Sequence, residues 1–206
     1  MLSERFEDAL VFAHHLHRNQ KRKTTGVPYV AHLLGAASLV IDDGGTEDEA
    51  IAALLHDAIE DQSRTFPGGR DALAAEIERR YGTEVLRIVI ACTEQSTPEE
   101  RRIPDKRARW RAHKQHYIEQ IVTQDVSVRR VSCADSIHNV RSMIKDYARM
   151  GNALWSRFLT KSGEDQLWAY DALAHALTDH GGTGLASELR RAVDDLARLL
   201  KAERAA

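Results

Sequence analysis

Hydrophobic residues recur along this chain at intervals of three to four positions, the spacing of an amphipathic helix, and strand-like alternation is scarce. Only four prolines interrupt the 206 residues. The pattern therefore predicts an all-α fold, a bundle of about ten helices. The expected helices cover residues 3–19, 28–41, 46–56, 69–81, 83–93, 105–123 and 126–147, with one short turn in 98–104 and two or three more helices toward the end.

Several of these boundaries carry helix signals. Ser3 is suited to cap the first helix, and Thr46 with Glu49 forms a capping box for the third. The chain has no internal repeat, low-complexity tract or convincing linker, so residues 1–206 are expected to form one domain. The side chains expected to pack its C-terminal part are Trp155, Phe158, Leu159, Leu167, Trp168 and Tyr170.

Composition narrows the class of protein. Hydrophobic residues make up 43% and charged residues 29%, which is ordinary for a globular domain. A net charge of −2 gives no reason to expect nucleic acid or an anionic membrane as partner, and no apolar run approaches the ~20 residues of a membrane span. Cys92 and Cys133 lack CxxC spacing and the N-terminus lacks a signal-peptide pattern, so a reducing, cytoplasmic location is expected. No pattern specifies an oligomeric state.

Candidate chemistry concentrates in residues 53–61, where an apolar helix-forming run ends in His56-Asp57. Glu60 and Asp61 follow at helical spacings that place them near this pair. One imidazole and three carboxylates at the end of an apolar helix are costly unless something there uses them. A divalent metal with a neighbouring acid/base is one interpretation, and a helix end that opens into a solvated acidic loop is the other.

Two further residues favour the metal. Asp135 lies amid apolar residues on a predicted helix, and His32 lies early in another. Taken alone, His32 suits a hydrogen-bonded core histidine and Asp135 suits an arginine partner. Together with His56 and Asp57 they supply two nitrogen and two oxygen donors, a set typical of a divalent metal site.

The order of these residues resembles the metal-ligand pattern of the HD phosphohydrolase superfamily, and residues 6–145 resemble the hydrolase domain of the RelA/SpoT family. The matching motifs are His17-x-x-Gln20-x-Arg22-Lys23-x-x-Gly26-x-Pro28-Tyr29-x-x-His32, then His56-Asp57-x-x-Glu60-Asp61, then Ala134-Asp135-x-x-His138-Asn139-x-Arg141. The chain departs from common family residues at Leu33, Gln62 and Ser132-Cys133. These departures leave the metal positions intact and fall in the surrounding shell.

The resemblance implies a single HD domain around one metal site, with the helices of residues 146–206 belonging to the same domain. Family members remove the 3′-pyrophosphate from guanosine tetra- and pentaphosphate alarmones and use Mn²⁺. It further implies that His32, His56, Asp57 and Asp135 bind the metal. We interpret Glu60 as the group that orients and deprotonates the attacking water, with Asp61 assisting.

A small-molecule nucleotide is the expected partner. The basic loop at Arg22 has an ordinary interpretation as solvated surface, but the resemblance implies that it lines the nucleotide pocket, with the Arg22 guanidinium on the purine. The remaining residues that the resemblance assigns to substrate are Lys23, Thr24, Asn139 and Ser142. It assigns packing to His138.

Two questions stay open at this stage. The basic helix around residues 106–114 is either a solvated face or a rim that attracts polyphosphate. The alternatives to an alarmone hydrolase are an HD phosphohydrolase for another nucleotide, such as an adenine alarmone, the 2′-phosphate of NADPH or a nucleoside monophosphate, and a non-catalytic nucleotide-sensing module.

Overall fold

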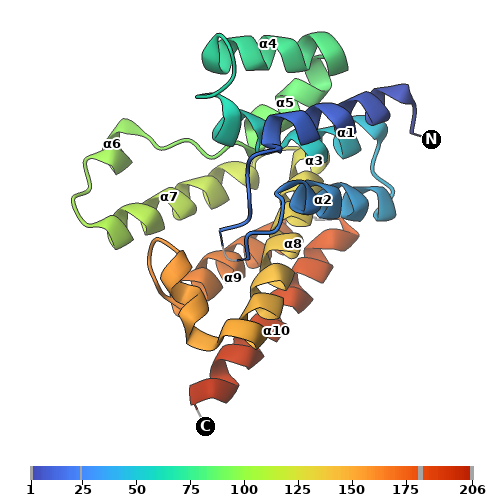
Figure 1. Ribbon diagram of the computed structural model, residues 1–206. Coiled ribbons are helices and arrows are strands. Elements are labelled where there is room, and N and C mark those ends of the chain that lie inside the picture. Colours follow the sequence, from blue (N-terminus) through green and yellow to red (C-terminus); the bar gives the residue numbers. More distant parts are fainter. Residues whose placement is uncertain (1, 24, 181–182, 205–206) are drawn as a thin grey trace.

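The computed structural model describes residues 2–23, 25–180 and 183–204, with side chains through residue 202. In this part of the chain the prediction of an all-α fold is confirmed, because ten α-helices account for most residues and the only β-type pairing is an isolated bridge between Lys21 and Pro28 (Figure 1). The α-helices are α1 (Glu4–His17), α2 (Val30–Asp42), α3 (Glu47–Leu55), α4 (Gly69–Tyr81), α5 (Thr83–Cys92), α6 (Pro98–Arg101), α7 (Lys106–Ile121), α8 (Val126–Met150), α9 (Gly163–Asp179) and α10 (Gly184–Arg204).

The predicted caps set the helix starts. The Ser3 side chain accepts a hydrogen bond from the Arg5 backbone N–H, and Thr46 and Glu49 make both bonds of the capping box. Each cap satisfies backbone N–H groups that have no partner within the helix. The structural boundaries therefore lie within about three residues of those predicted from the sequence.

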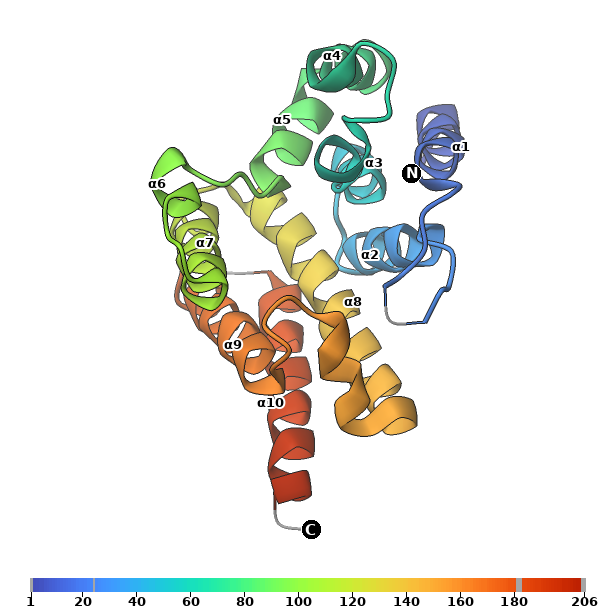
Figure 2. The same ribbon diagram turned by 60° about the vertical axis from the view of Figure 1, so that its left-hand side comes forward.

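Helix α8 is the central element. It packs against α2, α3, α5, α9 and α10 (Figure 2). Its buried positions include Val131, Ala134, Ile137 and Val140, which recur at three- and four-residue spacing. In the view of Figure 2, α1 and α2 lie on one side of α8, and α6 and α7 lie on the other. Residues from both halves of the chain therefore meet along α8.

One local prediction needs correction. The sequence suggested that an α-helix runs into the His56-Asp57 pair, but α3 ends at Leu55, these two residues form a turn, and Ala58–Gln62 is a π-helical turn, η1. Ile59 is buried at 1% exposure within this turn. Single π-helical turns are frequent at functional sites, because they redirect side chains relative to a regular helix.

The basic helix α7 was expected to be either a solvated face or a rim that attracts polyphosphate, and its basic residues differ in their contacts. Arg107 and Arg111 both bind the Asp165 carboxylate on α9, at 2.6 Å and 2.9 Å, so these two arginines join α7 to α9. Lys114, in the C-terminal half of α7, lines the cavity described below. The polyphosphate interpretation therefore applies to Lys114.

The segment between α8 and α9 begins with a 3₁₀ helix, η2 (Gly151–Arg157). Trp155 packs in the core at 5% exposure, as predicted. Leu159 was predicted to pack as well, but it is 64% exposed. It lies on the loop after η2 at the cavity rim, where no helix covers it.

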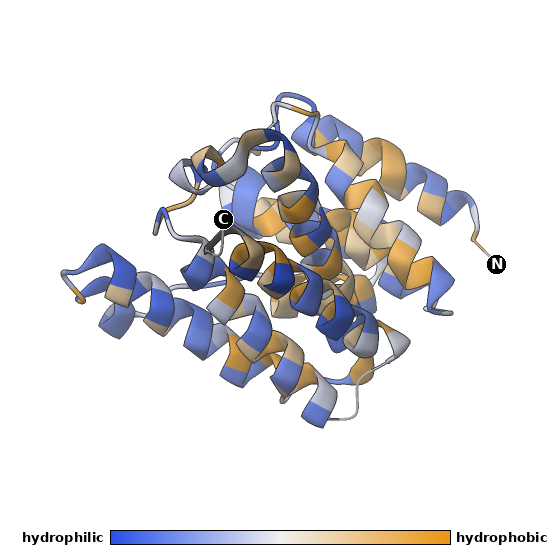
Figure 3. Ribbon diagram, turned by 90° about the horizontal axis from the view of Figure 1, so that it is seen from below, coloured by the Kyte–Doolittle hydropathy of each residue, from blue (hydrophilic) through white to orange (hydrophobic). Residues whose placement is uncertain are grey.

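Hydrophobic positions lie mainly on helix faces turned toward the interior, and hydrophilic positions lie mainly on outer faces (Figure 3). Core residues come from every described α-helix except the short α6. None of the described helices is both long and apolar enough to cross a membrane. The hydrophobic pattern therefore accounts for a packed bundle.

We expect Asp165→Asn to lower the free energy of unfolding by about 1–2 kcal/mol at neutral pH, because a fully buried carboxylate loses its charge-assisted bonds to two partly exposed arginines. Hydrogen bonds from Arg107 hold the pKa of Asp165 below its usual value, despite burial. The difference between the two proteins should therefore become smaller as the pH falls below about 4, toward the lowered pKa of folded Asp165.

Denaturant unfolding of both proteins between pH 3 and 7 measures this difference. Asp195→Asn is the matched control, because Asp195 pairs with Arg198 on an exposed helix face and should contribute less than about 0.5 kcal/mol. Equal stability losses in the two variants would contradict the assignment.

Candidate functional site

Three side chains far apart in the sequence meet beside α8. His32 comes from α2, His56 follows α3, and Asp135 lies on α8. One ligand atom of each lies within 4.8 Å of the others, so the group can hold a metal ion. The His32 and His56 Nε2 atoms are 3.3 Å apart, and Asp135 Oδ1 lies 3.1 Å and 3.5 Å from them. Three of the four predicted ligands are thus brought together.

Asp57, the fourth predicted ligand, lies at the edge of this group. Its Oδ2 atom is 3.0 Å from His56 Nε2 and 3.6 Å from His32 Nε2. The Tyr29 hydroxyl donates a 2.5 Å hydrogen bond to the same oxygen. Both histidines are buried, whereas the Asp57 and Asp135 side chains are 21% and 28% exposed. The carboxylates therefore form the side of the group that solvent and a ligand can reach.

The hydrogen bond of the outer nitrogen of His56 shows which ring nitrogen carries the proton and which presents a lone pair to the group. His56 Nδ1 lies 2.8 Å from the Ala53 carbonyl oxygen, which can only accept, so Nδ1 carries a proton. In the neutral ring, His56 Nε2 then presents a lone pair to the Asp57 carboxylate. Electron-rich atoms this close need a cation among them, either a proton or a metal ion. A mixed imidazole and carboxylate set suits a divalent metal, so the residues present fit one.

The pKa shifts of these residues also indicate that the group requires positive charge. Burial lowers the pKa of His56, but the charge of Asp57 and bonds to Asp135 raise it well above its usual value. Burial raises the pKa values of the two aspartates, but the adjacent imidazoles bring both below their usual range. Both aspartates are therefore carboxylates at neutral pH.

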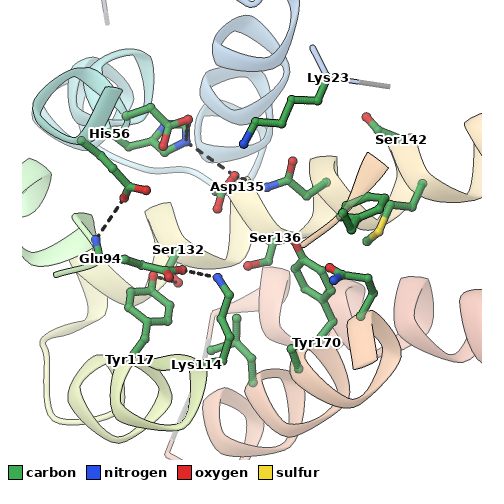
Figure 4. Close-up of a pocket in the computed structure, with 18 of the residues that line it drawn as sticks. Lys23, His56, Glu94, Lys114, Tyr117, Ser132, Asp135, Ser136, Ser142 and Tyr170 are labelled. Atoms are coloured by element: carbon green, nitrogen blue, oxygen red, sulfur yellow. Dashed lines mark hydrogen bonds and ion pairs between the residues drawn. The ribbon is translucent and has the colours of Figure 1, made fainter. Parts of the chain in front are cut away.

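A cavity of about 510 Å³ adjoins this group. Lys23 points into it from the loop before α2, and Lys114 points into it from α7 on the opposite wall (Figure 4). Tyr170, from α9, closes another side. The residues after about 145, which the sequence motifs did not need, therefore form part of the wall. They include Arg157, Phe158, Leu159, Gln166, Ala169 and Leu173.

Glu60 and Asp61, the predicted acid/base pair, lie on η1 and line this cavity. Glu60 Oε2 accepts a 3.2 Å hydrogen bond from the Glu94 backbone N–H. Burial, with a further contribution from nearby carboxylates, raises the pKa of Glu60 to about 7. Asp61 instead accepts a 2.6 Å bond from the Gln20 side chain. Of the two, Glu60 has the ionisation expected of a general base near neutral pH.

Arg22 reaches the candidate metal group through one intermediate residue. Its Nη2 donates a 2.7 Å hydrogen bond to Asn139 Oδ1, and Asn139 Nδ2 donates a 2.6 Å bond to Asp135 Oδ1. The Arg22 guanidinium also lies 5.7 Å from the centre of the Tyr29 ring. The loop before α2 is thereby tied to α8.

Two other predicted substrate residues lie at the cavity. Lys23 and Ser142 both line the cavity, from the loop and from α8. The predicted contact through Thr24 lies outside the described residues. The loop and α8 thus form two adjoining walls, as the nucleotide-pocket prediction requires.

Two polar residues of this site escaped the sequence analysis. Glu94 holds Glu60 through its backbone, and its own carboxylate binds Lys114 Nζ at 2.6 Å. Tyr29 binds Asp57 through its hydroxyl. Tyr29 belongs to the first motif, which was a usable signal, whereas Glu94 follows α5 in a loop with no motif at all.

Comparison with known proteins places this fold and site in a class. The chain matches the family described as HD domain over residues 9–164. The chain therefore belongs to the HD domain family.

Its curated relatives define the resemblance further. The mouse guanosine-3′,5′-bis(diphosphate) 3′-pyrophosphohydrolase MESH1 is 31% identical over 139 residues, which cover 66% of this chain and 68% of the relative. A probable guanosine-3′,5′-bis(diphosphate) 3′-pyrophosphohydrolase of Synechocystis is 30% identical over 66% of this chain and 16% of that longer protein. The resemblance to RelA/SpoT-type hydrolases is thus confirmed.

A solved structure agrees on the fold. It belongs to a metazoan ortholog of SpoT that hydrolyses ppGpp, with a TM-score of 0.66, 22% identity and 97% of each chain covered. The all-α architecture, including the C-terminal helices, is therefore shared along almost the whole chain.

We expect Asp135→Asn to weaken binding of a divalent metal at least tenfold, because the amide replaces a negative donor beside His32 and His56 with a neutral one. Asp61→Asn is the matched control, since Asp61 binds Gln20 and should leave metal affinity within about threefold. Isothermal titration with Mn²⁺ measures both. Equal affinities in the two variants would show that Asp135 is not a ligand.

Proposed function

We propose that this protein is a Mn²⁺-dependent hydrolase that removes the 3′-pyrophosphate of guanosine tetra- and pentaphosphate. The observation that carries the proposal is the convergence of His32, His56, Asp57 and Asp135 beside a cavity that also contains Glu60. The MESH1 relatives are named as 3′-pyrophosphohydrolases of guanosine-3′,5′-bis(diphosphate), which supports the same substrate class. A nucleotide sensor would have no need of a carboxylate with a raised pKa beside four candidate ligands.

The ion would be held by the two histidines and two aspartates, whose nitrogen and oxygen donors suit Mn²⁺. A divalent ion there supplies a water of lowered pKa and offsets charge on the phosphate oxygens. The Tyr29 hydroxyl holds the Asp57 carboxylate through a hydrogen bond. The ligand carboxylates therefore start close to the required positions.

Glu60 is the proposed general base. The Glu94 backbone N–H holds one of its oxygens, which leaves the other free to accept a proton from the attacking water. The water oxygen bonds to phosphorus, the bond from phosphorus to the 3′ oxygen breaks, and the 3′ oxygen takes up a proton. The products are then pyrophosphate and guanosine 5′-diphosphate from the tetraphosphate, or guanosine 5′-triphosphate from the pentaphosphate.

The walls of the cavity suit a substrate with several negative charges. Lys23 and Lys114 enter from opposite sides, and Arg22 lies on the loop wall. The net charge of the chain is −2, so these local cations, rather than the whole molecule, attract the substrate. We assign Arg22 to the purine face, and Asn139 and Ser142 to the ribose and phosphates.

The direct test is a Mn²⁺-supplemented hydrolysis panel with product identification. Guanosine 3′,5′-bis(diphosphate), its adenine counterpart, NADPH and nucleoside monophosphates are the substrates. The proposal requires the guanine alarmone to give pyrophosphate at the highest kcat/KM. Preference for another nucleotide would keep the hydrolase assignment and replace the substrate, and no turnover of any substrate would favour a sensing module.

Glu60→Gln should lower kcat by about 10²–10⁴-fold and leave KM and Mn²⁺ affinity nearly unchanged, because the amide keeps the shape and loses the base. In the unchanged protein, kcat should fall as pH drops through an apparent pKa at or below about 7, since the base must be ionised and a nearby cation favours the ionised form. Rates measured from pH 5 to 8 test this. A profile for the variant with the same acid limb and the same plateau would exclude Glu60 as the base.

Arg22→Ala should raise KM for the guanine alarmone at least tenfold and change kcat by less than about threefold, because Arg22 is assigned to the base and not to the reacting phosphorus. Its Mn²⁺ affinity should remain within about threefold. Arg149→Ala, on the exposed end of α8, is the control. A large loss of Mn²⁺ affinity would instead make Arg22 a support of Asp135 through Asn139.

A further inference from the structure

The two candidate histidine ligands are supported in different ways. His56 Nδ1 bonds to a backbone oxygen of its own helix, at Ala53. His32 Nδ1 has no such backbone partner in the described part of the chain and lies 2.8 Å from Nδ1 of another imidazole, that of His138 on α8. The ring centres are 4.8 Å apart. His32 is therefore supported by the side chain of His138, which a substitution can remove.

We propose that His138 is a positioning residue that fixes His32 in the tautomer whose Nε2 lone pair faces the metal. The proposal rests on the metal centre assigned above. His32 Nε2 faces Asp135 Oδ1 and His56 Nε2, so it must be unprotonated to bind a metal. The single proton of neutral His32 then lies on Nδ1 and is donated to His138 Nδ1, which accepts it.

This bond also determines the state of His138. With Nδ1 as acceptor, the neutral His138 ring carries its own proton on Nε2. It therefore cannot bind the same ion through Nδ1 without giving up His32. His138 acts on the metal through His32, in the way that outer partners of metal-bound histidines set ring orientation and basicity.

Gly35 provides the space for this arrangement. It lies three residues after His32 on the same helix, α2, and the His138 ring packs directly against it. A Cβ at position 35 would lie 2.1 Å from His138 Cδ2 and 2.5 Å from His138 Nε2, a separation that no side chain can occupy. One face of α2 thus contributes both the candidate ligand His32 and the space at Gly35 that the His138 ring occupies.

The near-isosteric pair His138→Asn and His138→Leu separates the acceptor from simple packing. The asparagine Oδ1 occupies the place of the histidine Nδ1 and can accept from His32, whereas leucine has similar volume and no acceptor. We expect His138→Leu to weaken Mn²⁺ binding by about 10–100-fold and His138→Asn by less than about threefold. Isothermal titration of the metal-free proteins with Mn²⁺ gives the affinities without any substrate.

Gly35→Ala tests the same bond from the opposite side. Alanine is favoured over glycine within a helix, so α2 should persist while the added Cβ displaces the His138 ring. We expect a loss of Mn²⁺ affinity similar to that of His138→Leu. Circular dichroism should show native helix content for all three variants.

Equal Mn²⁺ affinity in His138→Leu and the unchanged protein would overturn the positioning role and leave the metal centre standing. Equal losses in the Asn and Leu variants would make His138 a packing residue only. If the unchanged protein binds no Mn²⁺ at all, the metal centre and the positioning role are both wrong.

Discussion

The structure depends on a buried group of electron-rich atoms that needs a cation. His32 and His56 turn their Nε2 atoms toward each other and toward two carboxylates, inside a helical core that offers them little water. Bringing such atoms together without positive charge costs several kcal/mol, because their repulsion is weakly screened there. A bound divalent ion converts this repulsion into attraction. A bound ion would therefore stabilise the folded bundle, as is common for metal sites.

The surrounding helices keep these donors in place. α2, the turn after α3, and α8 each contribute candidate ligands, and their contacts with one another form a large part of the core. Helix α8 also carries the proposed substrate residues Asn139 and Ser142, whereas Arg22 and Lys23 lie on the loop before α2. Hydrogen bonds run from Arg22 through Asn139 to Asp135, which links this loop to the candidate metal group. Precision at the site follows from this shared support.

Much of this arrangement was predictable from the sequence. Helical periodicity and caps gave the helices, and the apolar surroundings of Asp135 and the motif around His56 gave the candidate ligands, because a buried polar side chain is unusual without a partner. Other features depend on tertiary contacts that no local pattern encodes. The π-helical turn of η1, in which Ile59 is buried, has no local signal, and the bond from the Glu94 backbone to Glu60 joins residues that no motif connects. The pairing of Arg107 and Arg111 with Asp165 likewise spans more than fifty residues.

The central claim is that the four converging side chains form a metal centre. Anomalous diffraction from a crystal grown with Mn²⁺ tests it most directly, because the signal locates the ion without assumptions about activity. We expect one strong peak about 2.0–2.3 Å from His32 Nε2, His56 Nε2 and an oxygen of each of Asp57 and Asp135. A Mn²⁺ peak elsewhere, with these four side chains unoccupied, would contradict it.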